Sequence, residues 1–354
     1  MRRSVATTTL AVLMIGAVAA PALACAGLVA PNGSVRLLRT STLAGYHNGM
    51  EHYVTSFEFQ GGGAKFGSIV PLPGVPDIND KGIYRVTRAG KWTLQRLQRE
   101  TQPAPVPAAE GSGGSADSGG KAEELYETEI DGLVITILEG GSRAVGKWAK
   151  EEGFSLTPDA PEVLRFYAQR SKIFMAVRFV PEKARKKKLE EGDGVPIHLR
   201  IPTDNPWVPL RILGLGKKAG GDVDADVYLL TDIQPSLLPA PVAPGERGLV
   251  LERSEQASDD LLDDLRGDRG MNWIPEESWL TYLRVDSDAG DLTYDLAIDA
   301  SGNGAPSEED AYGKQKEEDE STDDPYTGLL FGLALVPPLG FGALRARRSA
   351  STRG

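Results

Sequence analysis

Apolar and polar residues alternate along much of this chain, and a period of two is typical of half-buried β-strands. Residues 51–59 carry Tyr, Thr, Phe and Phe at every second position. Residues 66–72 form the next apolar run, after the glycines at 61–63. These two runs predict a pair of strands joined as a hairpin with a loose loop.

Further apolar runs predict more strands, and a different spacing predicts a few helices. The strands are expected at 133–138, 173–180, 195–201, 208–213, 227–231, 279–285 and 292–298. Apolar residues three or four apart predict helices at 142–151, 161–171 and 258–265. Because strands outnumber helices and do not alternate with them, we predict an α+β fold. It would consist of strand-rich antiparallel or mixed sheets with a few short helices, plus one C-terminal transmembrane helix.

Two segments lack the apolar residues that a core requires. Residues 101–121 are rich in Pro, Gly and Ser, and residues 301–325 are strongly acidic. Such compositions bury too little surface to offset the chain entropy that is lost on folding. We therefore predict a disordered linker and a disordered acidic stalk. The linker separates a first strand-rich block, 25–100, from a second α+β block, 122–300.

Residues 1–24 have the features of a secretory signal peptide. Two arginines precede an apolar run at 10–20, which is too short to cross a bilayer as a helix. Ala22-Leu23-Ala24 supplies the small residues that a signal peptidase needs, so we expect cleavage between Ala24 and Cys25. A lipoprotein signal also places a cysteine first, so lipidation of Cys25 stays open.

A second uncharged apolar segment lies near the C-terminus. Residues 326–344 span 19 positions without a charge, which is about 28 Å as a helix and enough to cross a bilayer. The tail, 345–354, holds four arginines, and basic residues beside a span stay in the cytoplasm. We therefore predict a single-pass protein of the cell membrane, with an extracellular body and a cytoplasmic C-terminus. Retention of the helix, or its removal as a sorting signal, stays open.

Composition narrows the class of function. The chain has 354 residues, and 39 Lys and Arg stand against 50 Asp and Glu, for a formal net charge of −11. This acidic balance argues against nucleic acid as a partner. One cysteine excludes an intrachain disulfide framework, and three histidines leave little room for a histidine-based metal cluster.

Closely spaced carboxylates are the candidate metal ligands. Asp222, Asp224 and Asp226 form a D-x-D-x-D run, which is how the calcium loop of an EF-hand begins. The glycine and glutamate that complete such a loop are missing. A second acidic turn contains Asp286, Asp288 and Asp291. Weak binding of Ca²⁺ is one interpretation, and solvated acidic turns are the other. No other cofactor is indicated.

Other chemistry is indicated less clearly. His47, His52 and His198 are the three imidazoles, and a metal or acid–base role would require His198 to lie beside the other two. The chain has no Gly-x-Ser-x-Gly elbow, no phosphate-binding loop and no dinucleotide fingerprint, so we predict no catalytic residue. Lys183–Lys188 is the one basic cluster of the body and would suit anionic lipids or wall polymers.

Several strand and turn motifs resemble those of a known family. They are Tyr53-Val-Thr-Ser-Phe-Glu-Phe, Phe66-Gly-Ser-Ile-Val-Pro-Leu-Pro-Gly-Val-Pro, Trp92-Thr-Leu-Gln-Arg-Leu, Phe174-Met-Ala-Val-Arg-Phe, Pro209-Leu-Arg-Ile and Val227-Tyr-Leu-Leu-Thr-Asp. Their order is similar to that in the DUF2330 family of exported bacterial proteins, over most of residues 25–300. The resemblance implies export to a bacterial cell envelope, and it supplies no catalytic residue.

These features together predict a cell-envelope protein with a non-enzymatic binding or structural body on the outer face of the membrane. Its expected partners are the lipid bilayer, through residues 326–344, and an envelope protein or wall polymer. The alternative is an extracellular hydrolase or metal-dependent enzyme with a site of dispersed Asp, Glu and His. A pocket that gathers two carboxylates, or a carboxylate beside His198, would favour that alternative.

Overall fold

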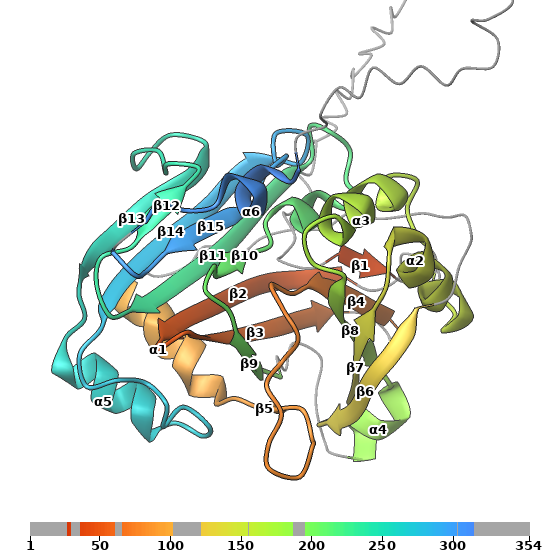
Figure 1. The fold of residues 1–354 in the computed structure, drawn as a ribbon, viewed down its shortest axis with the longest axis horizontal. Coiled ribbons are helices and arrows are strands. Elements are labelled where there is room, and N and C mark those ends of the chain that lie inside the picture. Colours follow the sequence, from red (N-terminus) through yellow and green to blue (C-terminus); the bar gives the residue numbers. More distant parts are fainter. Residues whose placement is uncertain are drawn as a thin grey trace, which may run out of the picture. The chain divides into compact units, whose positions relative to one another are not determined.

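Figure 1 shows a computed structural model of the chain, which describes residues 27–29, 36–60, 66–101, 122–154, 156–186, 195–302 and 304–314. These residues belong to one compact unit that ends at Lys314. The predicted signal peptide, the linker beyond Thr101, the apolar segment 326–344 and the tail lie outside the described residues, so these assignments stay predictions. Among the helices that are described, none is both long and apolar enough to cross a bilayer.

The largest sheet combines strands from both predicted blocks. Its seven strands lie in the order β13-β14-β11-β2-β3-β9-β5. Their bounds are β2 Arg36–His47, β3 Met50–Gln60, β5 Val86–Arg88, β9 Ile197–Pro202, β11 Asp222–Thr231, β13 Gly248–Gln256 and β14 Trp279–Asp288. β11 and β2 are parallel and the other neighbours are antiparallel, so the sheet is mixed. The two blocks therefore fold together.

Two smaller sheets complete the strands of the described body. A five-stranded antiparallel sheet has the order β1-β4-β8-β7-β6, and a three-stranded sheet has the order β10-β15-β12. Their bounds are β1 Gly27–Val29, β4 Phe66–Pro71, β6 Glu123–Ile130, β7 Leu133–Glu139, β8 Ile173–Phe179, β10 Trp207–Val208, β12 Ser236–Leu238 and β15 Leu296–Asp299. The strand-rich α+β class with mixed and antiparallel sheets is confirmed for this part of the chain.

The predicted hairpin between residues 51–59 and 66–72 is wrong. β3 pairs with β2 and β9, whereas β4 pairs with β1 and β8 in the five-stranded sheet. The partner of β3 is set by the turn at Asn48-Gly49, where φ is 51° and 72°. Asn-Gly with positive φ at both residues is a favoured two-residue turn between antiparallel strands, so it prevails over the longer glycine loop.

Six short helices and one 3₁₀ turn accompany these sheets in the described residues. They are α1 Lys91–Thr101, α2 Ser142–Glu151, α3 Ala160–Ala168, α4 Pro181–Lys186, η1 Arg211–Gly214, α5 Asp259–Gly267 and α6 Glu308–Tyr312. α2 has the predicted bounds, and α3 and α5 overlap their predicted ranges. In place of most of the strand predicted at 208–213, the chain forms η1, which directly follows β10 and Pro209-Leu210.

The core is layered on both faces of the large sheet. On one face, Tyr53 and Leu199 pack against Ile135 and Met175 of the five-stranded sheet, and β11 and β14 pack against the three-stranded sheet. α1 and α5 cover the opposite face, while α2 and α3 cover the other side of the five-stranded sheet (Figure 1). Alternation along β3 therefore sends the Tyr53 side chain into one interior and the Val54 side chain into the other.

The first part of the predicted acidic stalk is folded, which corrects the expectation of disorder for residues 304–314. α6 begins after Ser307, whose hydroxyl accepts a hydrogen bond from the Asp310 amide at 3.1 Å. Ala311 is fully buried, and its carbonyl accepts a hydrogen bond from the Asp295 amide at 2.8 Å. These contacts offset the entropy that is lost when a polar segment becomes ordered.

Candidate functional site

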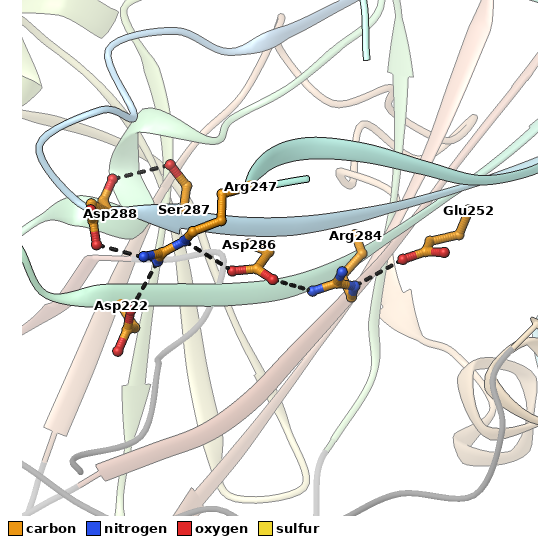
Figure 2. Close-up of polar contacts among 7 residues, drawn as sticks. All are labelled: Asp222, Arg247, Glu252, Arg284, Asp286, Ser287 and Asp288. Carbon is orange, nitrogen blue, oxygen red and sulfur yellow. Dashed lines mark hydrogen bonds and ion pairs between the residues drawn. The ribbon is translucent and has the colours of Figure 1, made fainter. Parts of the chain in front are cut away.

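The predicted acidic residues meet at one end of β11 and β14. Asp222, Asp224 and Asp226 alternate along β11 and therefore share one face of the large sheet. In the antiparallel pairing, Asp288 lies opposite Asp222, and Asp286 lies opposite Asp224. The two acidic motifs of the sequence are thus brought together across neighbouring strands (Figure 2).

Two arginines contact three of these carboxylates, those of Asp222, Asp286 and Asp288. Arg247 is 2.9, 3.5 and 3.2 Å from the carboxylates of Asp222, Asp286 and Asp288, respectively. Arg284 donates to Asp286 at 2.6 Å and to Glu252 at 3.0 Å. Figure 2 shows the resulting row of alternating charges across β13, β14 and β11. The guanidinium of Arg247 occupies the position from which a cation would contact these oxygens.

The remaining aspartates do not complete a metal site. Asp226 is fully buried and accepts a hydrogen bond from the Tyr282 hydroxyl at 2.8 Å. Asp291 lies in the turn after β14, where its amide donates to the Asp288 carbonyl at 3.0 Å. Same-face neighbours on a strand are about 7 Å apart, which is too far for three successive carboxylates to bind one ion. Within the described ranges, no three His, Cys, Asp or Glu are grouped as metal ligands.

Two of the three histidines lie together on the face that α1 and α5 cover. His52 of β3 has its Nδ1 at 3.0 Å from Nε2 of His198 in β9. The ring of Trp273 stacks on His52, with ring centroids 3.9 Å apart. His47 lies elsewhere, with its Nδ1 at 2.5 Å from the Asp232 carboxylate on the surface. His198 therefore contacts an imidazole and an indole, and His47 does not join it.

The buried histidine pair is neutral at pH 7. Burial, with smaller contributions from His198, Arg200 and His47, lowers the pKa of His52 to about 3. Burial also lowers the pKa of His198 to about 4, again with a contribution from Arg200. Groups with such pKa values hold no proton to donate as a general acid at neutral pH.

Glu51 is a buried carboxyl that the sequence analysis does not single out. It lies on β3 and is fully buried, and neither carboxyl oxygen has a hydrogen-bond partner among the described residues. Burial raises the pKa of Glu51 well above its ordinary value, and the backbone amide of Trp207 offsets part of this rise. The alternation of side chains along β3 could have indicated its burial, because position 51 lies on the same strand face as Tyr53.

An ion pair between Arg170 and Asp295 is also missed by sequence reasoning. Its side chains are only 1% and 0% exposed. The Tyr167 hydroxyl donates to Asp295 at 2.9 Å, and Arg170 donates to the Asp310 carbonyl of α6. The guanidinium lies over three aromatic rings, those of Phe166, Tyr167 and Trp207. Nε of Arg170 has no hydrogen-bond partner among the described residues, but the other contacts of the pair fasten α6 to the residues that follow α3 and precede β15.

The predicted basic cluster lies only partly within the described residues. Lys183 in α4 contacts the Glu129 carboxylate of β6 at 2.7 Å. Lys187 and Lys188 lie outside the described ranges. A role of this cluster toward lipids or wall polymers stays a prediction.

The fold and these contacts define a strand-rich α+β domain. Most of the charged side chains considered as candidate site residues form ion pairs or hydrogen bonds with other side chains of the domain. A family model described as "Uncharacterized protein conserved in bacteria (DUF2330)" matches residues 19–237. The chain therefore belongs to the DUF2330 family, and the resemblance of its motifs is confirmed.

Comparison with other proteins adds little to this assignment. A solved structure titled "Crystal structure of baculovirus P35" is similar at 10% sequence identity and a TM-score of 0.39, covering 75% of this chain and 97% of that chain. A likeness at this level carries no argument about function. A search of curated proteins gives no match.

Proposed function

We propose that this protein is an exported module of the bacterial cell envelope, anchored by residues 326–344, with a body that acts by binding or as a structural element. The observation that carries the proposal is the pattern of the two terminal regions. A signal-like segment precedes Ala24-Cys25, and an uncharged apolar segment precedes four arginines. Membership of a bacterial family is consistent with this proposal.

The geometry of the described body supports a role that does not depend on catalysis. The candidate carboxylates contact Arg247 and Arg284, and the buried histidines are stacked beneath Trp273. In addition, Arg170 fastens α6 to the body. A tether that continues from this segment would therefore begin at a fixed point on the domain.

The alternative, an extracellular hydrolase or metal-dependent enzyme, predicts a pocket in which carboxylates or His198 face a substrate. In the described residues, arginines hold the carboxylates and His198 lies against two rings. No observation on this part of the chain favours that alternative.

Protease treatment of intact cells tests the proposal. The full-length protein, with a tag after Gly354, would be expressed in a bacterium, and whole cells would be exposed to a protease before fractionation. We expect the body to be digested, while a tagged fragment survives in the membrane fraction until the cells are lysed. This result would place the body outside and the basic tail inside.

A variant with Leu333→Arg and Leu335→Arg provides the matched control. Two charges in the apolar segment make its insertion unfavourable, so this variant should leave the membrane fraction. Digestion of the tag with a protected body would show the opposite orientation. Recovery of the wild type in the soluble fraction would contradict anchoring.

A further inference from the structure

Trp273 covers the His52–His198 pair on the α1/α5 side of the large sheet. Its ring is nearly parallel to both imidazoles, at 17° to His52 and 22° to His198. The ring centroids are 3.9 and 5.5 Å apart, respectively. The three rings therefore form one stack, in which the indole separates the imidazoles from the outside of the sheet.

The position of Trp273 depends on a glycine and on its neighbours in the chain. A Cβ atom at Gly45 would lie 2.4 Å from Cη2 of Trp273, so only glycine lets the ring lie flat on β2. Nε1 of Trp273 is buried and has no hydrogen-bond partner in the described part of the chain, so stacking and packing hold the ring. Met271 and Ile274 flank it and are buried in the core below α1 and α5. A rotation of the Trp273 side chain can thus occur while the backbone stays anchored.

The facing nitrogens of the two imidazoles can share only one proton. In the neutral pair, one ring donates and the other accepts across 3.0 Å. When both rings are protonated, both nitrogens become donors, so the hydrogen bond is lost and two like charges face each other. Protonation therefore changes the pair from attractive to repulsive.

The charged groups around the pair do not compensate this repulsion. Arg200, opposite His52 in β9, and His47 on β2 both disfavour added positive charge. Arg200 has Asp77 at 3.5 Å and His47 has Asp232 at 2.5 Å, while β5 places the neutral Thr87 opposite His198. The other charged residues of α1, α5 and the loop after α5 bond elsewhere or lie exposed: Lys91, Arg96, Arg99, Glu100, Asp259, Asp260, Asp263, Asp264, Arg266, Asp268, Arg269, Glu276 and Glu277.

We propose that Trp273 is an acid-released cover: protonation of the His52–His198 pair rotates the indole off the sheet while the surrounding domain stays folded. The uncovered surface carries the positive charges of both imidazoles and of Arg200. Release of Trp273 thus changes the surface that it covers on β3 and β9 from neutral and buried to cationic and exposed. The depressed pKa values of about 3 for His52 and about 4 for His198 place the transition in the acid range.

The fluorescence of Trp273 tests this proposal. Spectra of the full-length protein and of Trp273→Phe would be recorded as the pH is lowered, and their difference isolates Trp273. We expect a reversible shift of the difference spectrum to longer wavelength, with a midpoint near pH 3 to 4. Acrylamide quenching of the difference signal should rise through the same range, and the far-UV circular dichroism should not change.

Histidine variants separate release of the cover from general acid unfolding. His52→Gln and His198→Gln should each abolish the transition, because a single imidazole cannot form the repelling pair. His47→Gln, which changes an imidazole outside the stack, should retain it. Persistence of the transition in both pair variants would overturn the proposal. So would loss of far-UV circular dichroism at the same pH in the wild type, a measurement that does not require any variant to fold.

Discussion

Replacing Glu51 by glutamine should stabilise the protein at neutral pH and leave its stability near pH 4 unchanged. The Glu51 side chain is fully buried, and neither of its oxygens has a hydrogen-bond partner among the described residues. Burial raises its pKa well above the ordinary value, so folding favours the protonated carboxyl. Glutamine has nearly the same shape and is neutral at every pH, so burying it involves no uptake of a proton.

The size of the effect follows from the unfolded chain. An unfolded glutamate has a pKa of about 4.3, and keeping the carboxyl protonated costs about 1.4 kcal/mol for each pH unit above that value. At pH 7 this cost is at most about 3.7 kcal/mol. Because the folded pKa is raised, the contribution of Glu51 is complete below the unfolded pKa and is lost as the pH rises. The advantage of Glu51→Gln should grow from about zero near pH 4 to at most about 4 kcal/mol near pH 7.

Urea denaturation of the wild type and of Glu51→Gln, near pH 4 and near pH 7, measures this difference. The matched control is Glu246→Gln, because Glu246 is exposed. That change should alter the free energy of unfolding by less than about 0.5 kcal/mol at either pH. A difference between wild type and Glu51→Gln that is the same at both pH values would refute the reasoning. It would mean that folding does not protonate Glu51.

Three further predictions concern other contacts. Asp268→Ala removes the carboxylate that accepts from the amide and hydroxyl of Thr93 at 2.7 and 2.8 Å, at the start of α1. The loss should be about 1–2 kcal/mol in urea denaturation, and an unchanged midpoint would show that the contact is dispensable. Arg170→Met leaves the buried Asp295 without its cation and should cost about 3–5 kcal/mol, seen as a lower melting temperature. An unaltered melting temperature would contradict that role. Millimolar Ca²⁺ should not change the melting temperature of the wild type, because Arg247 already contacts three aspartates; a clear rise would reveal a calcium site.

Local patterns in the sequence predict many elements, because amphipathic spacing is a property of neighbouring residues. The helix at 142–151 is an example, since Val145, Trp148 and Ala149 are buried on one face as the spacing indicates. β2 is not predicted at all. Its sequence alternates weakly, and it lies between β3 and β11, whose hydrogen bonds hold it in the centre of the large sheet. The pairing of β2 with β11 joins residues far apart in the sequence, whereas the Asn48-Gly49 turn that joins β2 to β3 is a local signal that the sequence analysis does not use.

The same distinction applies to the candidate site. The sequence analysis interprets Asp222, Asp224 and Asp226 as a calcium loop or a solvated acidic turn, whereas they alternate within β11 and share one face of it. Arg247 directly precedes β13 and Arg284 lies in β14, and only the pairing of these strands brings the arginines to the aspartates. Likewise, His52 and His198 are 146 positions apart in the sequence. The chemistry of both groups depends on strand order, which the amino-acid pattern does not specify.

Glu51 and the His52–His198 pair set opposite limits on the pH range in which the body is stable. The Glu51 pKa is raised on folding, so the stability that Glu51 contributes is lost as the pH rises above about 4.3. The pKa values of His52 and His198 are lowered on folding, so the stability that these two residues contribute is lost as the pH falls below about 6.5. Between these values each group changes the free energy of unfolding by up to about 1.4 kcal/mol per pH unit. Two histidines outweigh one glutamate, so the three together destabilise the fold on acidification. Glu51→Gln removes the opposing contribution, so the free energy of unfolding of this variant should fall more steeply with acid than that of the wild type.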